Sequence, residues 1–198
     1  MKTIYMTLSS IFIVLIGVYC VYLKQNKSPL SKSLFNLHCG VIASTVFYNI
    51  SLLTTTLWFA YFIISLYHIS IHFLIVLLAD FIFIFTEMPS SPKHKKFITV
   101  FKKIWLYVFL VDAFILIINP FFHHEFELSD LYINHNIFLC WTAKYFFVFY
   151  IHLCLCILLS AVIFAILLKK IIQTNRFYKS KYILVFAVFL ITFVVNII

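Results

Sequence analysis

The chain has 198 residues, of which 65% are hydrophobic and only 11% are charged, and its mean hydropathy is +1.10. A water-soluble domain of this length cannot bury so much apolar surface, so the composition indicates a protein whose solvent is the lipid bilayer. The net charge of +9 could suggest nucleic-acid binding, but the basic residues flank apolar runs, where they meet anionic headgroups. We therefore expect a multi-pass protein of the cell membrane with no nucleic-acid partner.

The apolar segments predict an all-α fold, a polytopic membrane helix bundle with about six transmembrane helices in one domain. Most segments are long enough for a hydrocarbon core of roughly 30 Å at 1.5 Å per residue. The second is the weakest because it carries several polar residues, and the third is long enough to tilt or to project beyond the headgroups. The predicted spans are residues 4–23, 34–55, 57–85, 104–122, 145–168 and 182–198.

The distribution of charge predicts how the bundle lies in the membrane. All lysines and arginines except Lys2 and Lys144 fall near the connections after the first, third and fifth spans, whereas the connection after the fourth span, residues 123–141, is acidic. Because short basic loops stay in the cytoplasm, the N-terminus and the acidic loop are expected outside. The last of six spans would then end outside without an interfacial anchor, so we expect the chain to be a fragment whose next span returns to the cytoplasm.

Asp112 is the most costly residue in the chain, because an isolated carboxylate near the middle of a span is expensive and normally faces the bundle interior. Trp105, Asp112 and Asn119 recur every seven residues and therefore share one helix face. The following Asn119-Pro120 step is expected to close that helix at its outer end. Two interpretations of Asp112 stay open: a hydrogen-bonded group that holds helices together, or a ligand- or proton-sensing group.

A second polar face is predicted on the third span, where Tyr61, Ser65, His68 and His72 lie within a narrow arc. This face is either a polar seam between helices or the lining of a ligand pocket. The two histidines, at i and i+4, could share a metal ion. No third ligand is evident in the sequence, since Asp80 lies well round the helix from His72.

The remaining polar residues suggest no defined chemistry. The outer loop contains His123, His124, Glu125 and Glu127, but their spacing matches no metal site, and we expect a solvated loop. Lys144 is expected to reach the membrane interface with its ammonium group.

The five cysteines, an odd number mostly within apolar runs, are expected to be buried free thiols. The thiols of Cys154 and Cys156 would point about 200° apart on a helix, a poor arrangement for clamping a metal. We expect no catalytic residue, metal or cofactor in this chain.

One segment resembles a known family. The run Asp112-Ala-Phe-Ile-Leu-Ile-Ile-Asn-Pro-Phe-Phe-His-His-Glu-Phe-Glu-Leu, followed by Tyr132, is similar to part of the multi-span N-terminal sensor region of bacterial receptors. That region, usually of seven helices, precedes histidine kinase or diguanylate cyclase domains in Gram-positive bacteria, and its fourth helix often ends in Asn-Pro. The resemblance covers residues 57–198 and implies an input module marked by Asp112, Asn119 and Pro120. The seventh helix and an output domain are not in the sequence, so any enzymatic activity would lie in a missing C-terminal domain.

We therefore expect a membrane sensory domain that can form a homodimer in its receptor and that responds to a small molecule or a membrane cue. Its candidate ligand- or signal-sensing residues are Tyr61, His68, His72, Trp105, Asp112 and Asn119. A small six-span transporter or accessory membrane protein is the alternative, although no internal repeat or midplane charge pair is visible. A membrane-embedded enzyme would require Asp112 to meet His68 or His72 within a few Å.

Overall fold

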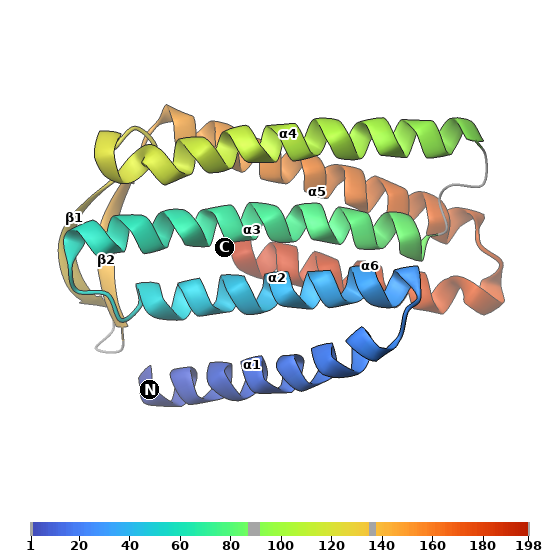
Figure 1. The fold of residues 1–198 in the computed structure, drawn as a ribbon, viewed down its shortest axis with the longest axis horizontal. Helices are drawn as coiled ribbons and strands as arrows, with labels where there is room; N and C mark the ends of the chain where they lie inside the picture. The colour runs from blue at the N-terminus through green and yellow to red at the C-terminus, as the bar shows by residue number, and fades with distance from the viewer. Residues whose placement is uncertain (1, 87–91, 135–137, 198) are drawn as a thin grey trace.

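In a computed structural model, which describes residues 2–86, 92–134 and 138–197, six helices run side by side and a β-hairpin closes one end of the bundle (Figure 1). The elements, in chain order, are α1 (Lys2–Gln25), α2 (Pro29–Ser51), α3 (Leu57–Phe85), α4 (Pro92–Phe122), β1 (Phe126–Asn134), β2 (Phe138–Tyr145), α5 (Phe147–Gln173) and α6 (Arg176–Ile197). Within the described residues, four of these helices are long and apolar enough to cross a membrane individually, namely α1, α3, α4 and α5. The predicted helix bundle is thus confirmed, with a hairpin added.

Several helix boundaries differ from the predicted spans, for local reasons. The second helix starts earlier than predicted, at Pro29, because the Ser28 side chain caps it by accepting the Ser31 N–H at 3.1 Å, and it ends at Ser51. The fourth helix begins at Pro92, so the basic stretch predicted as a loop forms its first turns.

The prediction that Asn119-Pro120 closes the fourth helix is also wrong, because α4 continues to Phe122 with Pro120 inside it. The helix stops where His123 adopts a left-handed conformation, with φ of 49°, a common way to end a helix. The His123 N–H donates to the Asn119 carbonyl at 2.8 Å, and its ring stacks on Tyr61 at 4.5 Å between centroids. These contacts stabilise a backbone conformation that is uncommon for a residue other than glycine.

The third helix is the centre of the bundle, because it contacts α2, α4 and α5. Its packing forms two separate apolar cores along its length. The hairpin core lies at the end that carries β1 and β2, and consists of Ala60, Tyr61, Leu116, Phe126 and Leu128. The basic-end core lies at the opposite end, and consists of Ala79, Ile82, Phe83, Ile98, Leu159, Ile163 and Leu167. Between these cores, each of α3, α4 and α5 places polar side chains in the interior.

The second and third helices approach closely at Gly40. A Cβ atom added there would lie 3.0 Å from Leu77 Cδ1 and 3.2 Å from Leu74 Cδ1. The chain has no GxxxG motif, so a single glycine provides this close contact.

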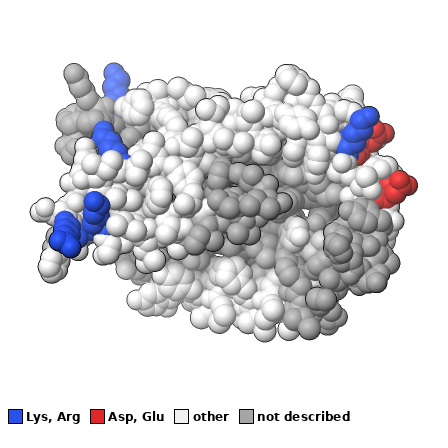
Figure 2. Space-filling model, turned by 180° about the vertical axis from the view of Figure 1, so that it is seen from behind, with Lys and Arg blue, Asp and Glu red and all other residues white. Residues whose placement is uncertain are grey.

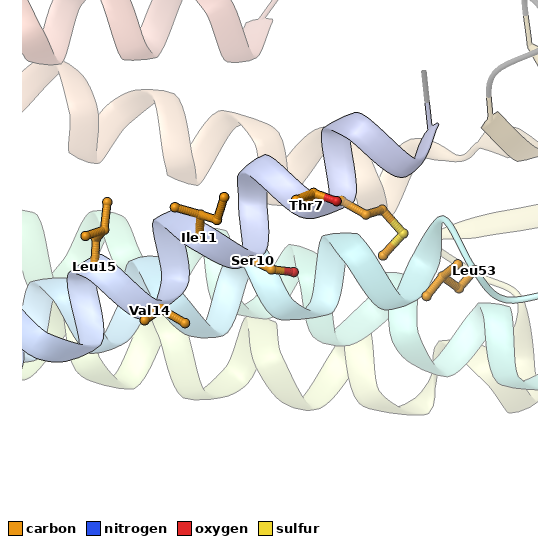
Figure 3. Close-up of a pocket in the computed structure, with 7 residues that line it drawn as sticks. Thr7, Ser10, Ile11, Val14, Leu15 and Leu53 are labelled. Atoms are coloured by element: carbon orange, nitrogen blue, oxygen red, sulfur yellow. The ribbon is translucent and has the colours of Figure 1, made fainter.

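The first helix lies at the edge of the bundle against α2 (Figure 1). Asn49 Nδ2 donates to Ser9 Oγ at 2.9 Å and ties the two helices together. Thr7, Ser10, Val14 and Leu53 help to line an apolar groove of 680 Å³ beside them (Figure 3). The outward face of α1 is apolar and exposed, as expected for a lipid-facing helix.

The acidic loop is not simply solvated, which corrects the prediction for residues 123–141. It contains an antiparallel hairpin in which Phe126 pairs with Tyr145 and Leu128 with Ala143, and the register shifts between Leu128 and Leu131. Phe126 is completely buried, which stabilises docking of the hairpin by roughly 2–3 kcal/mol. Trp141 Nε1 also donates to the Thr54 carbonyl at 3.1 Å, so the hairpin is fixed to the α2–α3 connection.

Charge is segregated between the two ends of the bundle. Basic side chains gather at one end and acidic side chains at the other, where one basic group accompanies them (Figure 2). The C-terminal ends of α1, α3 and α5 all lie at the same end of the bundle, opposite the hairpin (Figure 1). This is the arrangement that the sequence pattern predicted for the two sides of a membrane.

Candidate functional site

Asp112 has two partners in the interior, and one of them, His72, is a residue that the sequence linked to it only under the membrane-enzyme hypothesis. Its Oδ2 atom lies 2.6 Å from His72 Nδ1 and 2.8 Å from His152 Nδ1. All three side chains are buried. Because an ionised carboxylate only accepts hydrogen bonds, each Nδ1 carries the proton that it donates. One oxygen atom of α4 therefore joins α3 to α5.

The charge of the Asp112 carboxylate can be balanced within the His72–Asp112–His152 cluster itself. A carboxylate buried in an apolar interior must be neutralised or fully hydrogen-bonded, and two imidazoles provide both options. When either imidazole takes a second proton, the resulting cation lies against Asp112 and cancels its charge. The cluster can thus hold a proton, and it can also offer the remaining ring nitrogens to a ligand.

His68 extends the cluster toward the hairpin. Its ring lies 5.9 Å from that of His152, 5.0 Å from that of Phe149 and 5.9 Å from that of Phe126, between centroids. The rings therefore form a continuous path from β1 to the cluster.

Two of the predicted residues clamp the hairpin onto the helices. The Tyr61 hydroxyl accepts the Leu128 N–H at 2.7 Å and lies 3.4 Å from the Leu128 carbonyl. Asn119 Oδ1 accepts the Glu125 N–H at 2.7 Å, and Asn119 Nδ2 donates to the Phe126 carbonyl at 3.2 Å. These hydrogen bonds join β1 and Glu125 to α3 and α4, the helices that carry His72 and Asp112.

Glu125 is the second buried carboxyl group of the site. Its side chain is 1% exposed, and neither carboxyl oxygen has a hydrogen-bond partner among the described residues. The pKa of Glu125 is raised from 4.5 to about 7, chiefly because burial removes hydration from the carboxylate; His152 opposes this shift and the Asp112 carboxylate adds to it. Near neutral pH this carboxyl group is therefore present in both its protonated and its ionised form.

Glu125 and Asp112 both line a cavity of 350 Å³ between α4 and α5. The rest of its lining consists of Tyr107 and aliphatic residues of the two helices. An apolar cavity with two convergent acidic groups has the general form of a small-molecule site.

A family model described as the N-terminal 7TM region of histidine kinase matches residues 6–198. The chain belongs to this family. Comparisons with curated proteins and with solved structures found no match. The family resemblance predicted from the segment that begins at Asp112 is confirmed. The chain is a membrane-embedded sensory input region.

Within this histidine kinase input region, not every predicted residue reaches the cluster. Trp105 packs on the basic-end core, where its buried Nε1 has no partner among the described residues. Asp80 is also elsewhere: it forms an ion pair with Lys102 and accepts from Ser33 Oγ at 2.9 Å. Lys144 lies on β2 with its Nζ 5.5 Å from the centroid of the Phe146 ring.

The sequence interpretation missed three residues of the kinase input region: His152, Cys156 and Glu125. His152 is a lone histidine in an apolar run, and only the packing of α5 on α3 gives it partners. The two thiols of Cys154-x-Cys156 do face different ways, with Cys154 exposed and Cys156 buried beside His152. Cys20 is buried as predicted, but Cys39 and Cys154 are exposed on the bundle surface, and Cys140 lies outside the residues whose side chains are described.

Proposed function

We propose that this domain detects its cue through the His72–Asp112–His152 cluster and passes the signal to a cytoplasmic histidine kinase or diguanylate cyclase. The observation that carries the proposal is that one oxygen of Asp112 holds two neighbouring helices through two hydrogen bonds. A cue that weakens one bond more than the other would change how α3 and α5 pack on α4. Such rearrangements between two packings are the usual basis of signalling across helix bundles.

The hairpin and the cavity offer two routes by which a cue reaches the cluster. Tyr61 and Asn119 couple the hairpin to α3 and α4, and the cavity between α4 and α5 leads to Asp112. The hairpin, and Glu125 in the wall of the cavity, lie at the end of the bundle for which the charge pattern predicts an outside location. The receptor would then act as a homodimer, with the helix movement biasing the contact between two output domains.

The test uses membranes from cells that express the complete gene encoding this region. We expect Asp112→Asn to change either phosphohistidine formation or cyclic di-GMP formation several-fold at equal protein abundance, because the amide can no longer neutralise an imidazolium. Asp130→Asn, at an exposed position of the hairpin, is the matched control and should leave both activities unchanged.

Two results would count against the proposal. One is that both activities are the same in wild-type and Asp112→Asn membranes. The other is that the wild-type protein catalyses uptake of a radiolabelled solute and Asp112→Asn abolishes it, which would support the transporter alternative.

A further inference from the structure

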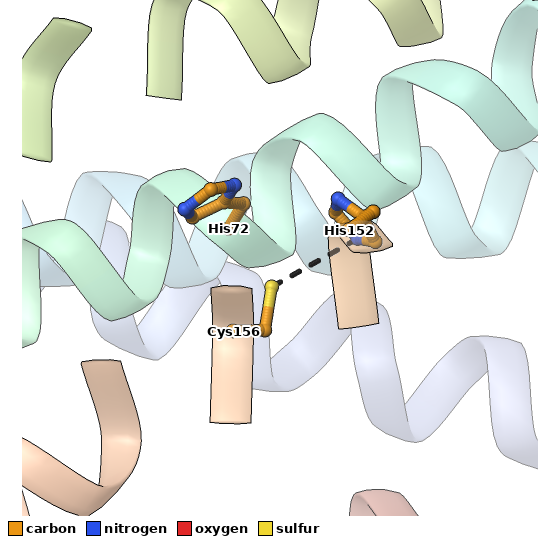
Figure 4. A group of neighbouring side chains, drawn as sticks. All are labelled: His72, His152 and Cys156. Atoms are coloured by element: carbon orange, nitrogen blue, oxygen red, sulfur yellow. Dashed lines mark hydrogen bonds between the residues drawn. The ribbon is translucent and has the colours of Figure 1, made fainter. Parts of the chain in front are cut away.

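Three soft or borderline metal ligands converge in the interior of the bundle. His72 of α3 faces His152 and Cys156 of α5 (Figure 4). One donor atom from each side chain lies within 4.8 Å of the other two, and all three residues are buried. Because His152 and Cys156 are at i and i+4, they occupy the same face of α5. Neither the pair His68 and His72 nor the pair Cys154 and Cys156 predicted this set.

We propose that His72, His152 and Cys156 bind a zinc ion, and that Asp112 orients the two imidazoles for it. A tetrahedral zinc site with Zn–N distances of about 2.0 Å and Zn–S distances of about 2.3 Å separates its donors by roughly 3.3–3.7 Å. Cys156 Sγ already lies 3.9 Å from His152 Nε2. Because donor atoms of the three side chains already lie within 4.8 Å of one another, rotation of the side chains is expected to close the set around an ion.

Asp112 prepares the histidines in the manner of known zinc sites. A ligating imidazole usually donates its other N–H to a carboxylate, which fixes the tautomer and increases the basicity of the ligand. Here Asp112 accepts from Nδ1 of both histidines, so both Nε2 atoms point away from the carboxylate, that of His152 toward Cys156 Sγ. Nε2 of His72 is buried and has no hydrogen-bond partner in the described residues. This unpartnered nitrogen is an independent indication that a ligand belongs there.

The charge of the site also favours a divalent ion. Zinc binds the thiolate, so the Cys156 thiol releases its proton when the Zn–S bond forms, and an imidazolium would release its extra proton as well. One Zn²⁺, one thiolate and the Asp112 carboxylate then sum to zero. A neutral assembly avoids the cost of a net charge in an apolar interior.

The donor set selects the class of metal. Two imidazoles and a thiolate suit zinc, whereas magnesium and calcium require oxygen ligands. Three protein ligands leave a fourth coordination position for water or a small molecule. The cavity between α4 and α5 reaches the site at Asp112, the residue that holds both imidazoles. If the input function proposed above is correct, zinc or a zinc-bound molecule is the cue, but binding itself can be measured without that assumption.

The test is cobalt substitution in the purified chain in lipid nanodiscs, because Co²⁺ takes the place of Zn²⁺ and reports a Co–thiolate bond by charge-transfer absorption in the near ultraviolet. We expect one Co²⁺ per chain, displaced by Zn²⁺, with this absorption present in the wild type and lost in Cys156→Ser. Cys154→Ser, two positions away and exposed, should retain it. Asp112→Asn should weaken Co²⁺ affinity about 10- to 100-fold and keep the thiolate absorption, as expected for a positioning residue.

Circular dichroism and gel filtration establish that each variant is folded before titration. The proposal is overturned if the folded wild type shows no thiolate absorption, or if Cys156→Ser keeps it. Metal binding with no change in kinase or cyclase output would contradict the proposed function while leaving the zinc site intact. If Asp112→Asn alters the kinase or cyclase output but the wild type binds no metal, the zinc site is contradicted and the proposed function stands.

Discussion

At the residue scale, the site combines two carboxyl groups in unequal surroundings. Asp112 is satisfied by two imidazoles, whereas Glu125 is buried without a partner among the described residues. The backbone of Glu125 is nevertheless fixed, since its N–H donates to Asn119 and its carbonyl accepts the Phe146 N–H at 2.8 Å. The chain therefore holds this carboxyl in place at an energetic cost, as is common at functional sites and rare elsewhere.

Glu125 should make the stability of the domain depend on pH. Its pKa is raised from 4.5 to about 7 in the folded chain, so the folded state binds more protons than the unfolded state between these values. Its contribution to stability is fully present below pH 4.5 and is lost as the pH rises through 7. We expect the loss to be on the order of 2–3 kcal/mol and to disappear in Glu125→Gln.

The measurement is the thermal unfolding temperature in nanodiscs between pH 5 and pH 8. Asp112 of α4 and His152 of α5 also act on the Glu125 carboxyl group, so only the difference between wild type and variant is interpreted. Glu127→Gln, at an exposed position of β1 two residues further on, should keep the wild-type slope. Equal slopes for wild type and Glu125→Gln would show that Glu125 titrates normally.

At the element scale, the hairpin should be held to α3 largely by one hydroxyl group. Tyr61→Phe leaves the buried Leu128 N–H without its acceptor, at a cost of about 1–3 kcal/mol. Hydrogen exchange of the Leu128 amide should accelerate about ten- to a hundredfold, while amides in the middle of α5 keep their rates. Tyr150→Phe, at an exposed tyrosine, is the control. Unchanged exchange at Leu128 in Tyr61→Phe would mean that the apolar contacts of Phe126 suffice.

The contact between α2 and α3 offers a second comparison, because the chain has only two glycines and their surroundings differ. Gly40→Leu forces a side chain against Leu74 and Leu77, whereas nothing lies within 4 Å of a Cβ atom at Gly17. We expect Gly40→Leu to destabilise the bundle by about 1–3 kcal/mol and Gly17→Leu to be close to neutral. Unfolding in mixed detergent micelles measures both, and equal midpoints for the two variants would contradict the close contact.

At the scale of the whole molecule, the sequence predicted what depends on local geometry. The seven-residue spacing correctly placed Asp112 and Asn119 on one buried face, and the arc from Tyr61 to His72 is buried along most of its length. Helix periodicity is sufficient for such statements. It does not reveal which helices meet, so the contact of Asp112 with His72 could be named only as a condition of the enzyme hypothesis, and the contact with His152 could not be predicted.

The hairpin is a different case, because its signal was present in the sequence. Within residues 126–128, apolar Phe126 and Leu128 flank Glu127, the alternation typical of a strand with one buried face. The acidic residues favoured a solvated loop instead. The structure shows that the charged positions alternate with the residues that insert into the hairpin core. Burial of Glu125 depends on this docking, so it could not be predicted without the hairpin.

The segregation of charge predicts the orientation of the whole bundle in the cell membrane. Lys27 lies between α1 and α2 at the basic end, and Asp130 lies on the hairpin at the other end, and both are exposed. Because positively charged segments are retained in the cytoplasm, Asp130 should face the outside and Lys27 the inside. With the native cysteines replaced, a membrane-impermeant maleimide added to intact cells should label Asp130→Cys fully. It should label Lys27→Cys only after the cells are permeabilised. The opposite pattern would place the hairpin and its cavity in the cytoplasm, and a cue could then reach Glu125 and Asp112 only from inside the cell.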